Sequence, residues 1–194
     1  SALINWLENT ATPEEYAQIG RCLEENNTPE GKDFAKLAIE ALRNGLNVDF
    51  IDRIINEIDK PCQANIVNEA KESDSNITEL LNITFGGNIE FPLIYRNELL
   101  PTNADGTTPL ARTNYSWGNN NSISDIEIIF NNKFLDKGTD IAIFSTTLHE
   151  NVHAILIQLV DKGVITTSNQ NLDYIILAEE WAKIEADRRL GGQG

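Results

Sequence analysis

The sequence predicts an α+β domain, mostly helical, with a small, partly antiparallel sheet beside one long apolar helix. Three observations support this fold class. Helix-start signals recur through the first third of the chain. Two β-rich runs follow in the middle. A later stretch, residues 141–160, repeats apolar side chains at spacings of three and four, which is typical of a helix that is mostly buried.

The first third is expected to form helices that pack through their apolar faces. Thr12-Pro13-Glu14-Glu15 combines a capping box with proline at the first helical position, so a helix should run from there to about Asn26. The same kind of signal at Thr28-Pro29 predicts a second helix, which ends at Gly45. Further helices are expected from Asn47 to Ile58, from Pro61 to Lys71 and from Ser75 onward.

The middle of the chain predicts strands and one long loop. Residues 89–95 form a β-rich run, and the proline within it, Pro92, favours an edge strand. Residues 101–121 are rich in Asn, Thr, Gly and Pro and are typical of a long loop. Residues 125–131 alternate in polarity, which predicts a second strand, and Thr139 or Asp140 should cap the long helix that follows.

Composition argues against several classes of partner. The chain carries 30 acidic and 15 basic residues, a formal net charge of −15. Such an acidic chain is a poor match for nucleic acid or an anionic membrane surface, because both need clusters of Lys and Arg. No run of 18 apolar residues occurs, so no membrane span is predicted. Cys22 and Cys62 are not part of a C-x-x-C pair, and they could form a disulfide or remain thiols.

The length of 194 residues allows one sizeable core. We expect an N-terminal helical region, residues 1–72, packed on a core of residues 73–194, with the two forming one continuous domain. The chain begins Ser1-Ala2-Leu3, without Met and without a basic segment, so no signal peptide is predicted and a piece of a longer protein is expected.

The central motif of the sequence is His149-Glu150-Asn151-Val152-His153, an H-E-x-x-H pattern that contains both histidines of the chain. Residues four apart share one face of a helix, so the two imidazoles can converge on one zinc ion. Glu150 lies beside the first histidine, where it can act as the general base for a water molecule. The alternative is a buried helix that carries two polar residues on a solvated edge.

A catalytic zinc site needs a third protein ligand, and with no further histidine it must be a carboxylate. A last helix is predicted from about Leu172 to Leu190. It offers Glu179, Glu180, Glu185 and Asp187. A histidine pair on one helix and a glutamate from the next resembles the gluzincin branch of the zincin metallopeptidases, some of which carry that ligand as E-x-x-A.

Glu179-Glu180-Trp181-Ala182 matches this E-x-x-A pattern, so the resemblance implies Glu179 as the third ligand and a zincin-like core. It also implies that residues 126–131 are the edge strand along the substrate cleft. A tyrosine should stabilise the oxyanion, and Tyr115 and Tyr174 are candidates, although for both a packing role is the more common one.

A closer similarity is to metallopeptidase domains at the C-terminal ends of bacterial Rhs-type and other polymorphic secreted toxins. It covers about residues 40–190 and is carried by residues 45–57 and by T-x-x-H-E-x-x-H-A at residues 146–154. It implies a zinc peptidase that is secreted or delivered from a bacterial cell, a protein or peptide substrate, and an immunity protein as partner. The alternatives are a catalytically inactive, zinc-stabilised binding module and a hydrolase of cell-wall peptide.

Overall fold

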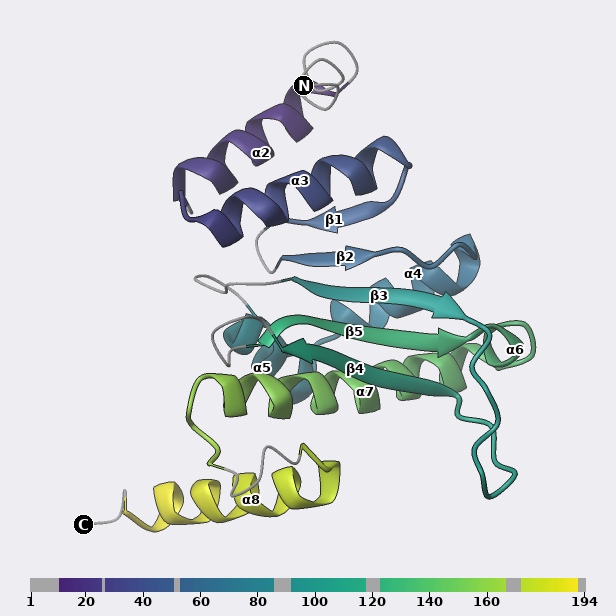
Figure 1. The fold of residues 1–194 in the computed structure, drawn as a ribbon, viewed down its shortest axis with the longest axis vertical. Helices are drawn as coiled ribbons and strands as arrows, with labels where there is room; N and C mark the ends of the chain where they lie inside the picture. Colours follow the sequence, from purple (N-terminus) through teal and green to yellow (C-terminus); the bar gives the residue numbers. More distant parts are fainter. Residues whose placement is uncertain are drawn as a thin grey trace.

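The protein is described by a computed structural model, which covers residues 11–25, 27–50, 53–85, 92–117, 123–166 and 172–191. Helices flank a five-stranded mixed sheet, which confirms the predicted α+β class (Figure 1). The helices in these ranges are α2 (Pro13–Glu25), α3 (Pro29–Arg43), α4 (Pro61–Lys71), α5 (Asn76–Phe85), α6 (Asn132–Leu135), α7 (Asp140–Asp161) and α8 (Tyr174–Gly191). The strands are β1 (Asn47–Asp49), β2 (Ile54–Asn56), β3 (Leu93–Glu98), β4 (Ala111–Trp117) and β5 (Ile123–Asn131).

The strands lie in the order β1-β2-β3-β5-β4. The central strand β3 is parallel to both of its neighbours, whereas β1 pairs antiparallel with β2 and β4 pairs antiparallel with β5. The sheet is therefore partly antiparallel, as predicted. The crossover from β2 to β3 passes through α4 and α5, because parallel strands need a long connection.

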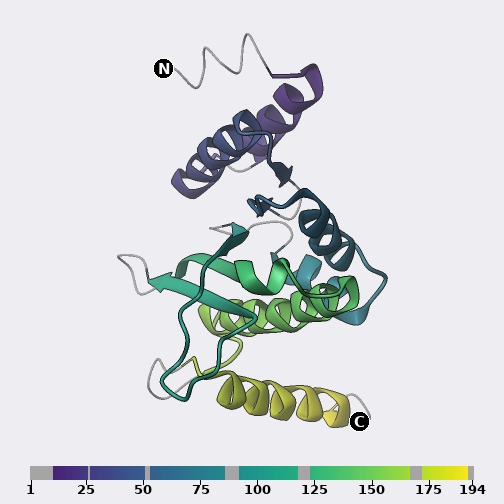
Figure 2. The same cartoon turned by 90° about the vertical axis from the view of Figure 1, so that its right-hand side faces the viewer.

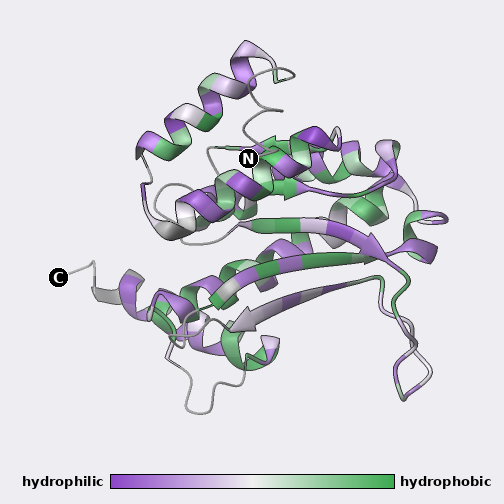
Figure 3. Cartoon of the chain, turned by 45° about the horizontal axis from the view of Figure 1, so that its top comes forward, coloured by the Kyte–Doolittle hydropathy of each residue, from purple (hydrophilic) through white to green (hydrophobic). Residues whose placement is uncertain are grey.

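The two faces of the sheet are covered by different helices (Figures 1 and 2). Helices α4, α5 and α7 bury one face in a large core, to which the strands contribute side chains such as Leu93 and Ile128. Helices α2 and α3 cover the opposite face near β1 and β2 with a smaller core that includes Phe34 and Ile55. The central strand β3 is hydrophobic at its start and hydrophilic towards its end (Figure 3).

The prediction of a helix from Asn47 to Ile58 is wrong, because this stretch contains β1 and β2. Gly45 adopts a left-handed φ of 74° after α3, and Arg53 adopts a φ of 51° just before β2. Ile54 and Ile55 are adjacent and both buried, one in each core. Only a strand can place consecutive side chains on opposite faces of a sheet, so tertiary packing overrides the helical spacing of the isoleucines.

The predicted edge strands are also wrong. The run at residues 89–95 corresponds to β3, which is central, and Pro92 precedes its first residue, so the missing N–H costs no ladder bond. Residues 89–91 lie outside the described ranges.

The strand expected along the cleft, residues 126–131, belongs to β5, which lies between β3 and β4. The edges of the sheet among the described strands are β1 and β4, and β4 lies inside the predicted loop.

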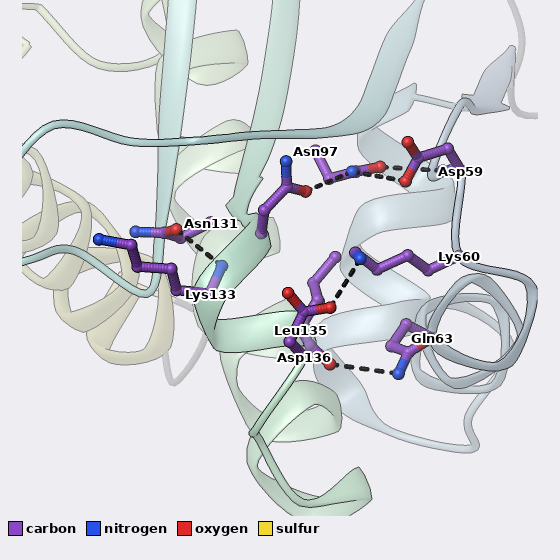
Figure 4. Close-up of polar contacts among 9 residues, drawn as sticks. Asp59, Lys60, Gln63, Asn97, Asn131, Lys133, Leu135 and Asp136 are labelled. Carbon is purple, nitrogen blue, oxygen red and sulfur yellow. Dashed lines mark hydrogen bonds and ion pairs between the residues drawn. The ribbon is translucent and has the colours of Figure 1, made fainter.

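Polar contacts tie the end of the sheet to the helices that lead into α7 (Figure 4). Asn97 at the end of β3 donates to Asp59 at 2.7 Å, and the ammonium of Lys60 lies 2.7 Å from a carboxylate oxygen of Asp136. Gln63 of α4 donates to the backbone oxygen of Leu135 at 3.1 Å. These contacts fix α6 and thereby the starting point of α7.

The sheet joins strands from both sides of residue 72, because β2 pairs with β3. The predicted N-terminal region is not wholly helical, since it contributes β1 and β2. The division into residues 1–72 and 73–194 stays a prediction. Cys22 and Cys62 are not joined by a disulfide. No helix in the described ranges has the length and apolar character needed to cross a membrane.

Candidate metal centre

The H-E-x-x-H motif lies in the middle of α7, which packs against β4 and β5. Thr139 caps the helix, and its hydroxyl accepts a hydrogen bond from the N–H of Ala142 at 3.3 Å, as predicted. The helix turns Asn151 towards the sheet, where its side-chain oxygen accepts a hydrogen bond from the hydroxyl of Tyr95 at 2.8 Å. The motif is therefore held at a fixed rotation about the helix axis.

The two histidines lie one turn apart on the same face of α7. The Nε2 atoms of His149 and His153 lie 3.1 Å apart. Two nitrogens 3.1 Å apart, each 2.0–2.1 Å from one zinc ion, would subtend an angle of about 100° at the metal, near the tetrahedral value. The pair thus fits two positions of a zinc site.

Glu150 points away from the helix axis towards β4 and is 6% exposed. Its Oε2 atom accepts a hydrogen bond of 2.6 Å from the hydroxyl of Thr113. Sequence reasoning missed Thr113, because it placed this residue in a loop. The alternation of Ala111, Thr113 and Tyr115 with polar neighbours was the available signal.

The side chain of α8 that reaches the histidines is Tyr174. Its ring stacks on the His153 ring with centroids 4.1 Å apart and an interplanar angle of 12°, and its centroid lies 5.7 Å from that of His149. Stacking restricts rotation of the His153 ring. Tyr115, the other tyrosine considered from the sequence, packs on β4 against the large core. An oxyanion role for either tyrosine stays a prediction.

The surroundings favour neutral His153. Burial lowers the pKa of His153 below its ordinary value, and the neighbouring His149 lowers it further, while Glu150 acts in the opposite direction. A neutral imidazole has a free lone pair, which is the form that binds a metal. Metal binding at neutral pH would therefore not need to displace a proton from this residue.

A cleft of about 400 Å³ opens beside His149 and Glu150. Its walls come from the start of β4 and from α7. The lining residues are Pro109, Leu110, Ala111, Ser145, Thr146, His149 and Glu150. This volume is within the range of small-molecule and peptide side-chain sites.

The structure does not bring Glu179 to the histidines. Leu177 of α8 is buried, and Trp181 packs against the same core, so this side of α8 faces the body of the protein. Glu179 follows Leu177 by two residues, about 200° around the helix, and is exposed, as are Ile175 and Ala182 on its own face. No group of three or more His, Cys, Asp or Glu side chains in the described ranges is arranged to hold a metal. Glu179 as third ligand stays a prediction, one that requires α8 to turn.

Comparison with known proteins found no relative of this chain. No protein-family model, curated protein or solved structure matches the chain. The chemistry available to the chain is therefore inferred from its own geometry.

That geometry combines three chemical capacities on one helical turn and one strand. A histidine pair offers two nitrogen donors at zinc spacing. A buried carboxylate lies directly beside them, held by a hydroxyl from β4. An open cleft reaches both His149 and Glu150. Such a set can hold a divalent metal and accept a proton from a water molecule next to it.

Proposed function

We propose that this chain is a zinc-dependent metallopeptidase that hydrolyses peptide bonds, with His149 and His153 as zinc ligands and Glu150 as general base. The observation that carries the proposal is the 3.1 Å spacing of the two Nε2 atoms beside a buried carboxylate. A hydrogen bond between the two rings can also hold exposed His149 and half-buried His153 at this distance, so the buried carboxylate of Glu150 next to them is what favours a catalytic site over a solvated helix edge.

Zinc held by these residues would supply Lewis-acid activation of a water molecule and of the substrate carbonyl. Glu150 takes the proton of that water and can pass it to the leaving amine. The hydroxyl of Thr113 holds its carboxylate. His149 and His153 bring their Nε2 atoms to 3.1 Å of each other, so both nitrogens can reach one ion. Tyr174 holds the ring of His153 by stacking.

The edge strand β4 supports a peptide as the substrate. It borders the cleft through Ala111, and in the described ranges no strand lies beyond it in the sheet. An extended peptide can add to such an edge through backbone hydrogen bonds, which makes recognition tolerant of side-chain sequence. The peptide carbonyl would then pass in front of His149 and Glu150.

The resemblance to polymorphic toxin domains extends this proposal to a toxin or effector domain of a longer bacterial protein, delivered out of the producing cell and inhibited by an immunity protein. The alternative, a zinc-stabilised binding module without catalysis, is favoured by one observation. In the described ranges, no third ligand joins the two histidines. Catalysis and binding alone are separated by the experiment below.

The test compares zinc content and hydrolysis of a fluorogenic unfolded protein in the wild type and in Glu150→Gln. The proposal expects about one zinc per chain in both proteins, and loss of turnover by roughly 10²–10⁴-fold in the variant. Glu69→Gln, an exposed glutamate of α4, is the matched control and should behave as wild type. Wild-type protein that binds zinc but never hydrolyses peptide would support the binding module, and loss of zinc in Glu150→Gln would show that the residue is a ligand.

A further inference from the structure

The proposed general base, Glu150, belongs to a helix, but its carboxylate is held by a residue of a strand. Glu150 belongs to α7, but the hydroxyl that binds its carboxylate comes from Thr113 in β4, 37 residues earlier in the chain. The Thr113 oxygen lies 2.6 Å from Glu150 Oε2 and 3.3 Å from the backbone oxygen of Glu150. Hence one side chain contacts both the functional group and the helix turn that positions it.

We propose that Thr113 is a positioning residue that orients Glu150 for catalysis and links this orientation to the strand on which the substrate lies. The inference rests on the proposed peptidase function. Thr113 binds Oε2, which leaves Oε1 as the oxygen that faces the attacking water. A hydrogen bond of this kind fixes a side chain that otherwise has several rotamers, and a base must lie within hydrogen-bond reach of its proton.

The register of β4 adds the link to the substrate. The N–H of Asn131 donates to the backbone oxygen of Leu110 at 2.8 Å, which marks a hydrogen-bonded pair. Such pairs alternate in an antiparallel ladder, so Thr113, which lies opposite Ile128, is in a non-hydrogen-bonded pair. The backbone N–H and C=O of Thr113 therefore point away from β5, towards the open edge of the sheet.

Thr113 thus has two separable parts. Its backbone faces the edge where an extended peptide would bind, and its hydroxyl faces Glu150. A substitution that removes only the hydroxyl should leave substrate binding intact while it releases the base. This predicts a specific kinetic signature, a fall in kcat without a rise in KM.

A purely structural role predicts something else. If the hydroxyl only fastens β4 to α7, its loss should lower the melting temperature without selectively lowering kcat. The test therefore uses the nearly isosteric Thr113→Val and the conservative Thr113→Ser. Asn114→Val is the control, because this neighbour in β4 points to the opposite face of the sheet.

In zinc-loaded protein, Thr113→Val should keep one zinc per chain and lose roughly 10–100-fold in kcat, the effect typical of groups that orient catalytic residues. KM should stay within about twofold of wild type. Thr113→Ser should restore most of the lost kcat, and Asn114→Val should match wild type. Wild-type kcat in Thr113→Val, equal losses in the control, or failure of serine to rescue would each overturn the inference.

A second readout needs neither metal nor activity. In metal-free protein, chemical denaturation of Thr113→Val, Glu150→Leu and the double variant forms a double-mutant cycle, because leucine removes the acceptor that glutamine would keep. If the hydroxyl and the carboxylate contact each other, the change in stability of the double variant differs from the sum of the single changes. Additivity would show that the contact is absent and would overturn the inference. Wild-type protein without zinc binding or hydrolysis would overturn the proposed function and this inference together, whereas a failing Thr113 test with active wild type overturns the inference alone.

Discussion

Removal of the Tyr95 hydroxyl should loosen the motif helix from the sheet. Tyr95 of β3 and Asn151 of α7 are both fully buried, and the tyrosine donates to the asparagine side-chain oxygen at 2.8 Å. Burial raises the pKa of Tyr95 far above its usual value, so the hydroxyl stays protonated and remains a donor. Asn151 lies between the two histidines of the motif, so this bond fixes the rotation of α7 at the proposed metal site.

The loss of stability expected for Tyr95→Phe follows from the buried polar atoms that the substitution leaves without a partner. In Tyr95→Phe, the oxygen of Asn151 loses its partner, and its amide nitrogen already has none among the described residues. A buried polar group left without a partner costs about 1–3 kcal/mol. For a chain of this length, each kcal/mol lowers the melting temperature by about 2–4 °C. The expected loss is therefore roughly 2–12 °C.

Thermal unfolding followed by circular dichroism measures this loss, and Asn151→Leu supplies the decisive comparison. Asn151→Leu alone should also destabilise, because it leaves the buried tyrosine hydroxyl without an acceptor. The double variant Tyr95→Phe/Asn151→Leu removes both polar groups and should lose less than the two single variants together. A melting temperature of Tyr95→Phe within about 1 °C of wild type, or strictly additive losses, would refute the reasoning.

Three further predictions concern other parts of the molecule. Glu179→Ala should lose zinc in metal analysis while Glu180→Ala keeps it, because two histidines alone hold zinc poorly, and this result requires α8 to turn. Zinc retained in both variants would contradict Glu179 as the third ligand. Burial raises the pKa of Glu57, so the ionised carboxylate destabilises the folded protein at neutral pH. Glu57→Gln should therefore raise the melting temperature at pH 7. This gain should vanish as the pH falls towards about 4, where the carboxyl group becomes protonated in both the folded and the unfolded protein. Gly138→Ala should lower the free energy of unfolding by about 1–3 kcal/mol in chemical denaturation, because the new Cβ would lie 2.9 Å from the backbone oxygen of Phe134.

The helices were predictable where the signals that start them are local. Thr28 accepts a hydrogen bond from the N–H of Gly31 at 3.1 Å, and Pro29 is the first residue of α3, as the sequence indicated. Pro61 opens α4, which ends at the predicted residue, Lys71. Caps and helix-opening prolines act within one turn, so neighbouring residues in the sequence are enough to predict where a helix starts.

The strands were harder to predict because their stability comes from distant partners. Ile54 and Ile55 have the spacing of a helix face together with Ile51 and Ile58, but the structure buries Ile54 and Ile55 on opposite faces of a sheet. β4 is poor in apolar residues because it lies at the edge, where only one face packs. It also lies inside residues 101–121, whose Asn- and Thr-rich composition resembled a loop, although Thr113 and Tyr115 alternate as strand residues do.

The candidate site likewise has one part that local sequence predicts and another that depends on tertiary packing. The convergence of His149 and His153 depends only on the geometry of one helical turn, and the spacing of the motif predicted it. The contact between Thr113 and Glu150 depends on how β4 packs against α7, which no local pattern specifies. The position of Glu179 depends on the rotation of α8, which the burial of Leu177 sets. A metal site with two ligands from one helix and support from a strand thus has a part that short-range spacing predicts and a part that only tertiary packing can place. The zinc content of Glu179→Ala and the kinetics of Thr113→Val each test the tertiary part without disturbing the local one.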